Sequence, residues 1–325
     1  MSLRWLAALV IACAVAVGAL CAAAAGKPPA APAARTETTG FLTVTSMSDP
    51  QGTVRVRLPA DMAAGDTITG TVVVEPAGGS DAQRAANESI LNGYVVEAGA
   101  NKAQVAQRVI TFVVPSTATL AALVLRRANG AVAGRADVPV RARPNPVTHP
   151  ALPGDFKLPQ VAVAGQPFAI AGPFSGDAAH TALAIGGRSA EIVAESPRTL
   201  VAVPPANAVG PSSMQLNESG IAAAAACNVL SLGLSASSTR LAKGAHATVH
   251  VTVGGLSGIR LPVYVRLVNA TPAVVSLGGG QTQVLTIQPN EVRSDGTYLT
   301  DRDVTGLSAG TFSLNATLDA QLPRL

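Results

Sequence analysis

The sequence is poor in cysteine: its 325 residues include three, and two of these, Cys13 and Cys21, lie in the apolar N-terminal stretch. If that stretch is removed, only Cys227 remains, and a single cysteine cannot form an internal disulfide. The domains must therefore be stable through hydrophobic burial, for which roughly 100 residues per domain is sufficient. Cys227 lies in the apolar run AAAAACNVL, which indicates a buried, inert thiol rather than a nucleophile.

Aromatic residues are also scarce, at 3% of the chain, and the single tryptophan, Trp5, lies in the N-terminal stretch. Sugar-binding sandwiches and proteins that bind single-stranded nucleic acid use exposed aromatic faces for stacking. The basic residues are scattered, with Arg126 and Arg127 as the densest pair, so the net charge of +4 forms no stripe for nucleic acid. We therefore expect no nucleic-acid partner.

The first residues, MSLRWLAALVIACAVAVGALCAAAAG, have the layout of a secretory signal peptide. Arg4 precedes an apolar stretch, and Ala22 and Ala24 give the A-x-A pattern that suits signal peptidase. We predict cleavage near residue 25, and hence a secreted, periplasmic or cell-envelope protein. An uncleaved anchor and a lipoprotein modified at Cys13 or Cys21 are the alternatives, and only in those cases would the leader hold the protein to a membrane.

Most of the remaining chain shows the period of two that is typical of strands. In TVRVRL, the apolar residues Val54, Val56 and Leu58 alternate with Arg55 and Arg57. About seven such short segments, bounded by Gly, Pro, Asn or Ser, fall in roughly 100 residues, which is the count expected of an immunoglobulin-like sandwich. The sequence thus predicts an all-β fold of tandem immunoglobulin-like β-sandwiches.

Gly186 and Gly187 lie in the stretch LAIGGRSAEIVAESPRTLVAVP, where a glycine pair could cradle a phosphate or turn a hairpin. A phosphate loop needs a helix after the glycines, but Pro197 interrupts the following segment after about nine residues. No Gly-Lys-Ser/Thr motif is present. Glycine tolerates positive φ, so we predict a two-residue β-hairpin turn here.

Within residues 158–226, an opening motif contains Gly165, Phe168, Ile170, Gly172 and Phe174. It is followed by the Gly186-Gly187 hairpin and by a strand with Val201, Val203 and Pro204. In these features the segment resembles an IPT/TIG domain. One departure is Pro173, where the family usually has asparagine. The resemblance implies an immunoglobulin-like fold and, as in secreted bacterial proteins, a binding or spacer role.

These observations divide the chain as follows. We expect a signal peptide (1–25), a Pro/Ala-rich tether (26–39), an immunoglobulin-like sandwich (40–143), a proline-rich linker (144–157), an IPT/TIG-like sandwich (158–228) and another immunoglobulin-like sandwich (229–325).

Residues with catalytic or metal-binding chemistry do not cluster in the sequence. His246 and His250 would face the same side of one strand but about 13 Å apart, too far to share one ion. His149 and His180 have no ligand-type neighbours. Asp295, Asp301 and Asp303 could hold calcium, but turn chemistry at Asp295 and surface placement explain them equally well.

We therefore predict no catalytic residue, no metal ligand and no cofactor. The expected function is that of an exported, non-catalytic protein that binds an envelope or extracellular protein partner or spaces envelope components. The alternatives are a carbohydrate-binding accessory module and an enzyme whose site forms only in three dimensions. The sequence leaves the oligomeric state open.

Overall fold

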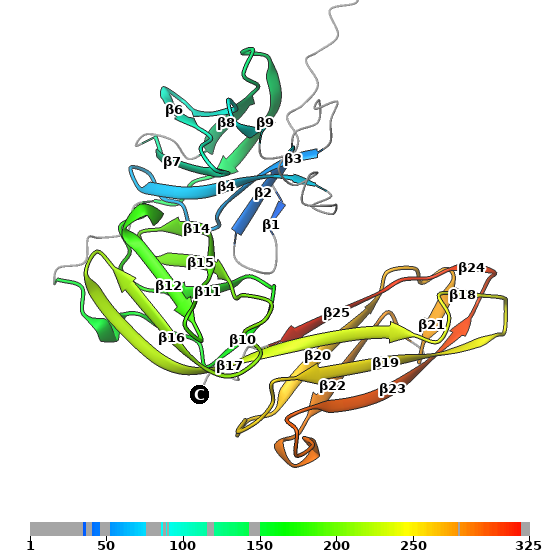
Figure 1. Cartoon of the computed structure of the whole chain (residues 1–325). Helices are drawn as coiled ribbons and strands as arrows, with labels where there is room; N and C mark the ends of the chain where they lie inside the picture. Colours follow the sequence, from blue (N-terminus) through cyan, green and yellow to red (C-terminus); the bar gives the residue numbers. More distant parts are fainter. Residues whose placement is uncertain are drawn as a thin grey trace, which may run out of the picture.

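The computed structural model describes residues 35–36, 41–45, 53–75, 86, 89, 91–115, 120–142, 150–278 and 280–319. The expected leader, most of the expected tether and His149 lie outside the described residues. The fold is all-β, as predicted, and its strands form three sandwiches of the immunoglobulin-like class (Figure 1). No helix among the described residues is both long enough and apolar enough to span a bilayer.

The first sandwich packs two sheets around one core. The predicted alternation of β3 is confirmed: Val54, Val56 and Leu58 are buried, whereas Arg55 and Arg57 are half-buried. One sheet has the order β1-β2-β3-β4, with β7 also paired to β4, and the other has the order β6-β5-β8-β9. The strands are β1 (Arg35–Thr36), β2 (Phe41–Thr45), β3 (Thr53–Pro59), β4 (Thr67–Glu75), β5 (Val95–Ala98), β6 (Asn101–Gln104), β7 (Val109–Val113), β8 (Leu120–Arg126) and β9 (Val132–Pro139).

The second sandwich packs the sheet β14-β15-β11 against the sheet β13-β12-β16-β17, with β10 added in parallel to β17. Its core includes Phe156 and Phe174, whose rings meet edge to face at 5.3 Å between centroids. The elements are η1 (Pro153–Asp155), β10 (Val161–Val163), β11 (Phe168–Ala171), η2 (Ala178–His180), β12 (Thr181–Ile185), β13 (Arg188–Ser189), β14 (Glu191–Ser196), β15 (Thr199–Val203), β16 (Gly210–Glu218) and β17 (Ile221–Ala236).

The glycine pair turns a hairpin, as predicted. Gly186 and Gly187 have φ of +60° and +75°, and they join β12 to β13 in the register Ile185↔Arg188. Positive φ at both central residues is the signature of a type I′ turn, whose twist matches that of the flanking strands. The residues that follow form strands β13 and β14, so the structure has no helix after the glycines to bind a phosphate.

The third sandwich packs the C-terminal half of β17 with β19, β23 and β21 against the sheet β22-β20-β25. Its core is built of alternate residues of the long strands, such as Val249, Val251 and Val253 of β19. The elements are β18 (Arg240–Leu241), β19 (His246–Gly254), β20 (Val263–Asn269), β21 (Val275–Leu277), β22 (Thr282–Ile287), η3 (Pro289–Glu291), β23 (Tyr298–Gly306), β24 (Gly310–Thr311) and β25 (Leu314–Asp319).

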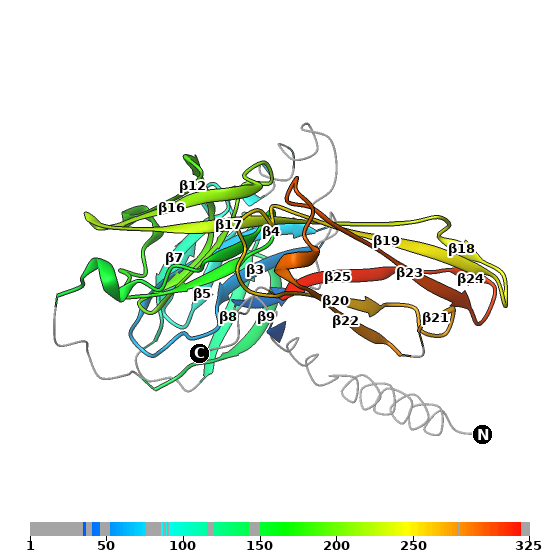
Figure 2. The same ribbon diagram turned by 90° about the horizontal axis from the view of Figure 1, so that it is seen from below.

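One strand belongs to both the second and the third sandwich. The first half of β17 pairs with β16 from Ile221 to Val229, and the second half pairs with β19 from Ser231 to Ala236. Val229 lies in the second core and Leu230 in the third. The ribbon therefore continues unbroken from one sandwich into the next, and the third projects away from the other two (Figures 1 and 2).

A turn after β19 fastens this second junction. The Asn228 side-chain Nδ2 donates to the carbonyls of Gly255, at 3.0 Å, and Ser257, at 2.8 Å. Gly255 has φ of +81°, and a Cβ on it would lie 2.2 Å from the Val229 carbonyl oxygen. Only glycine allows the turn to approach β17 this closely.

The first and second sandwiches also share a sheet. β14 pairs with β4 through Glu195↔Thr69, so the strands of the first sandwich continue into β14 and β15. Val193, Ala194 and Val201 form a buried cluster separate from the second core, and β14 also lies beside β3. The β14–β15 hairpin is thus buried on both faces, by its own core and by the neighbouring sandwich.

We predict that Gly255→Ala destabilises the second junction. The substitution combines a left-handed backbone with a steric overlap, so the free energy of unfolding should fall by at least about 2 kcal/mol in urea titrations. Gly258→Ala is the matched control: its φ is +76°, but nothing lies within 4 Å of a Cβ there. That variant should lose only about 1 kcal/mol, and equal losses in the two variants would contradict the close approach.

Candidate functional site

The two histidines on β19 lie on its exposed face, as predicted. Each contacts a different residue of β23: His246 Nδ1 lies 3.1 Å from Thr305 Oγ1, and His250 Nδ1 lies 2.7 Å from Asp301 Oδ1. These are cross-strand pairs on a solvated sheet face, and such pairs stabilise neighbouring strands modestly. The histidines do not converge on one point.

The three aspartates are also separate. Asp295 Oδ1 accepts hydrogen bonds from the Thr297 amide, at 2.9 Å, and the Thr297 hydroxyl, at 2.6 Å, which hold the pKa of Asp295 below its usual value. Asp301 and Asp303 share the exposed face of β23, where Asp303 accepts from Thr248. In the described part of the chain, no three His, Cys, Asp or Glu side chains come close enough to hold a metal ion.

The remaining sequence candidates have structural roles. Cys227 is buried in the second core, and burial raises the pKa of its thiol. A thiol held in its neutral form is a poor nucleophile. The expectation that His180 has no ligand-type neighbour is wrong, because this exposed residue lies 3.7 Å from Asp177, which precedes η2.

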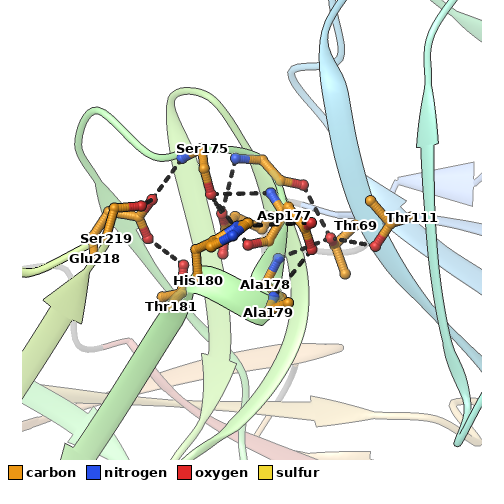
Figure 3. A network of polar contacts seen from close by, with 12 residues as sticks. Thr69, Thr111, Ser175, Asp177, Ala178, Ala179, His180, Thr181, Glu218 and Ser219 are labelled. Atoms are coloured by element: carbon orange, nitrogen blue, oxygen red, sulfur yellow. Dashed lines mark hydrogen bonds and ion pairs between the residues drawn. The ribbon is translucent and has the colours of Figure 1, made fainter.

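Two buried glutamates that the sequence analysis missed do converge. Glu195 on β14 is 0% exposed, and Glu218 at the end of β16 is 3% exposed. Both accept hydrogen bonds from Ser175: its amide donates to Glu218 at 2.8 Å and its hydroxyl to Glu195 at 3.3 Å. The Thr181 hydroxyl donates to the other Glu218 oxygen. Ser175 and Thr181 lie near the two ends of one segment, residues 174–181, which we call the junction loop (Figure 3).

The junction loop docks on the first sandwich through Thr69 of β4. The Thr69 hydroxyl donates to the Gly176 carbonyl at 3.0 Å and accepts from the Ala178 amide at 3.1 Å (Figure 3). Gly176 has φ of +82°, and a Cβ on it would lie 1.9 Å from the Thr67 carbonyl oxygen. The backbones of the junction loop and β4 are therefore in close contact. The two glutamates accept hydrogen bonds from Ser175 and Gly176 of the same loop.

Burial raises the pKa of Glu195 to about 7, and the neighbouring Glu218 carboxylate adds to the rise. Interactions with Thr181, Gly176 and Ser175 favour the charged form and oppose this effect. Glu195 Oε2 is buried with no hydrogen-bond partner among the described residues. A proton on that oxygen removes the cost of a buried, unpaired charge.

An ion-pair cluster lies at the same junction. Arg198 donates to Asp66 Oδ2 at 2.7 Å, its Nε lies 3.4 Å from Asp61 Oδ2, and the Thr199 hydroxyl donates to Asp61 at 3.0 Å. Asp66 is 5% exposed and also accepts from the Ala63 amide at 3.0 Å. Arg198 and Thr199 belong to the second sandwich and both aspartates to the first, so these bonds tie the two together.

Two grooves border the first half of β17. The first groove, of about 630 Å³, is lined by residues of β12, β13, β14, β16 and β17 that include Ser189, Gln215, Asn217 and Ala222–Ala224. The second groove, of about 530 Å³, lies between the η1 segment and Ala222–Ala225. Among the described residues that line the two grooves, Lys157 is the one with an ionisable side chain, and neither lining includes the buried glutamates.

No protein-family model and no curated protein matches the chain. Among solved structures, it is similar to SGBP-B of the mixed-linkage glucan utilization locus of Bacteroides ovatus, solved with mixed-linkage heptasaccharide (13% identity, 79% of this chain, 73% of that chain, TM-score 0.26). It is also similar to SGBP-B from a complex xyloglucan utilization locus in Bacteroides uniformis (12% identity, 89% of this chain, 99% of that chain, TM-score 0.26). A third similar structure is FdeC, an Escherichia coli adhesin (13% identity, 89% of this chain, 92% of that chain, TM-score 0.21). The likeness is one of fold class.

We predict that Glu195→Gln removes a pH dependence of stability. Because the folded-state pKa of about 7 exceeds the usual 4.5, the folded chain binds more protons than the unfolded chain between these values. The contribution of Glu195 to wild-type stability should then be fully present below about pH 4.5 and fall by about 3 kcal/mol as the pH rises through 7. The glutamine side chain carries no charge to desolvate, so urea unfolding at pH 8 should show the variant to be more stable than wild type.

Glu191→Gln on the same strand is the control, because Glu191 is exposed and lies 3.6 Å from Arg108. Its stability should follow the wild-type pH profile. A Glu195→Gln protein that is less stable than wild type at pH 8 would show that the Glu195 charge is compensated and that the pKa is not raised.

We also predict that Arg198→Met destabilises the first junction by about 2 kcal/mol, between the values for exposed and buried ion pairs. The loss comes from leaving Asp66 buried with a single remaining donor. The double variant Asp66→Asn with Arg198→Met should recover most of that loss, as urea titration would measure. If the double variant instead loses the sum of the unfolding free energies lost by the two single variants, the Asp66 and Arg198 side chains are not coupled.

Proposed function

We propose that this chain is an exported, non-catalytic protein of tandem immunoglobulin-like sandwiches that binds a protein partner at the cell envelope. The observation that carries the proposal is the chemistry of the two grooves. Their described linings combine alanines with larger apolar and uncharged polar side chains and one lysine, and the acids that do converge are packed against the junction loop. Such surfaces suit contact with another protein better than acid–base chemistry, which needs ionisable groups within reach of a substrate.

Three further features support the proposal. The N-terminal residues have the pattern of an export signal, and the middle segment resembles IPT/TIG domains, which serve as binding or spacer modules. The shared strand and the buried junctions also favour a stiff body, and a stiff body presents a surface in a fixed direction. Function on loops and edges held by a rigid scaffold is common in such folds.

A carbohydrate ligand is the second candidate, because Ser189, Gln215 and Asn217 of the first groove could hydrogen-bond to sugar hydroxyls. The aromatic faces on which sugars stack are missing from the lining residues of the first groove, and Phe156 beside the second is buried in the core. We therefore favour the protein partner.

The test combines export with binding. The protein should be found in the envelope or secreted fraction with an intact mass that begins near residue 26, and the labelled mature chain should bind intact cells saturably. Treating those cells with protease should abolish binding, and a glycan array should stay negative. Binding that survives protease, or a positive array, would replace the protein partner with a carbohydrate; a full-length cytoplasmic species would contradict export.

A further inference from the structure

The first half of β17 has a strand neighbour on one side only. On one edge, β16 pairs with it along its length from Ile221 to Val229. On the other edge, β10 pairs with Asn228, Val229 and Leu230 alone. Residues 221–227 therefore have no paired strand on that side in the described part of the chain.

The hairpin register shows which backbone groups point out from this edge. Ser219 and Gly220, with φ of 50° and 88°, form a two-residue turn between Glu218 and Ile221. In such a hairpin the flanking pair is hydrogen-bonded, and bonded pairs then alternate along the ladder. Ala222, Ala224 and Ala226 consequently direct their N–H and C=O groups away from β16, and we call these three residues the alanine edge.

The next residue in the same series confirms the direction. The Asn228 amide donates outward to the Gln160 carbonyl at 2.8 Å, just where β10 begins. The residues that precede β10 in the sequence do not pair with β17. The Lys157 amide donates instead to the carbonyl of Ala171 at 2.7 Å, and Ala171 belongs to β11 in the opposite sheet. The second groove lies in the space between this departing segment and the alanine edge.

Few of the features that usually prevent edge pairing occur on the alanine edge itself, and η1 lies beside it across the second groove. Natural sheets protect exposed edges with charged side chains, proline or bulges. The side chains of the alanine edge are small and exposed, and the β16–β17 register runs from Glu218↔Ile221 to Gly210↔Val229 without a shift. Both grooves border Ala222–Ala224, so the edge is open along the second groove and flanked by the first.

We propose that the alanine edge takes up an extended, uncharged segment of the partner protein as an additional strand, an inference that rests on the proposed function. Outward groups recur at every second residue, about 6.6 Å apart, and another β-strand matches that spacing with its own N–H and C=O groups. The segment is uncharged because the groove linings offer no counter-charge except Lys157, whose Nζ already donates to the Gly154 carbonyl.

The test measures amide hydrogen exchange by NMR on the mature chain. The probe is an acetylated, amidated peptide of sequence PSSMQLN, which is the part of β16 that pairs with Ala222–Asn228 on the opposite edge. In the free protein, amides of the alanine edge should exchange at least about tenfold faster than those of Ala223 and Ala225. Millimolar peptide should slow the three edge amides by at least about tenfold.

Ala224→Pro removes one outward donor without touching the β16 ladder, a placement that edge strands tolerate. It should abolish the slowing by peptide, whereas Ala224→Thr, which keeps the N–H, should retain it. Edge amides that are already protected in the free protein, or unaffected by peptide, would overturn the proposal. Protection that rises with protein concentration alone would overturn it in favour of a second copy of this chain.

Cell binding separates this inference from the proposed function. If Ala224→Pro loses peptide protection yet binds cells like wild type, the edge is not the partner site although the protein still binds a partner. If the peptide protects the edge but the wild-type chain binds no cells, the edge accepts a strand and the proposed function fails. Loss of both in Ala224→Pro, with both kept in Ala224→Thr, supports the two together.

Discussion

Strand β17 contributes to two hydrophobic cores with one uninterrupted backbone, and the placement of the third sandwich depends on this. Its ladder with β16 fixes its direction in the second sandwich, and its ladder with β19 carries the same direction into the third. A flexible linker would let two domains reorient, whereas bending here would break a ladder or expose Val229 and Leu230. The hydrogen bonds of Asn228 and the approach of Gly255 act on this same strand.

The first junction is held together differently. There, β4 and β14 share a single paired position, and side chains supply the remaining polar contacts. Glu195 and Glu218 lie behind the junction loop, and Arg198 spans the two sandwiches. Because the Glu195 carboxyl group titrates and salt screens ion pairs, while a backbone ladder depends on neither, the two junctions should differ in sensitivity to solution conditions.

Local patterns in the sequence predicted local structure well. Alternation identified β3 and the exposed face of β19, and the glycine pair identified its hairpin, because both depend on neighbouring residues alone. Glu218 could have been found by the same rule, since Met214, Leu216 and Glu218 alternate on the inner face and Thr181 lies opposite Glu218. Its burial was overlooked because an acid breaks an apolar pattern.

Glu195 could not have been found in this way. A register shift between Ile192 and Ala194 interrupts the alternation of β14, and Val193, Ala194, Glu195 and Ser196 are all buried. Their burial depends on β3 and β4, more than a hundred residues earlier, and a single sequence does not reveal such non-local pairing.

Rigidity also bears on how an edge could bind. A strand that adds to a sheet loses conformational entropy as it becomes ordered, at a cost of about 1–2 kcal/mol per residue for the backbone. An edge that was itself mobile would add a comparable cost on its side. The alanine edge lies on a strand already fixed by β16 and by the two cores beyond it, so only the incoming segment has to be ordered. The stiffness of the junctions and the openness of that edge therefore act together, because the shared strand supplies both.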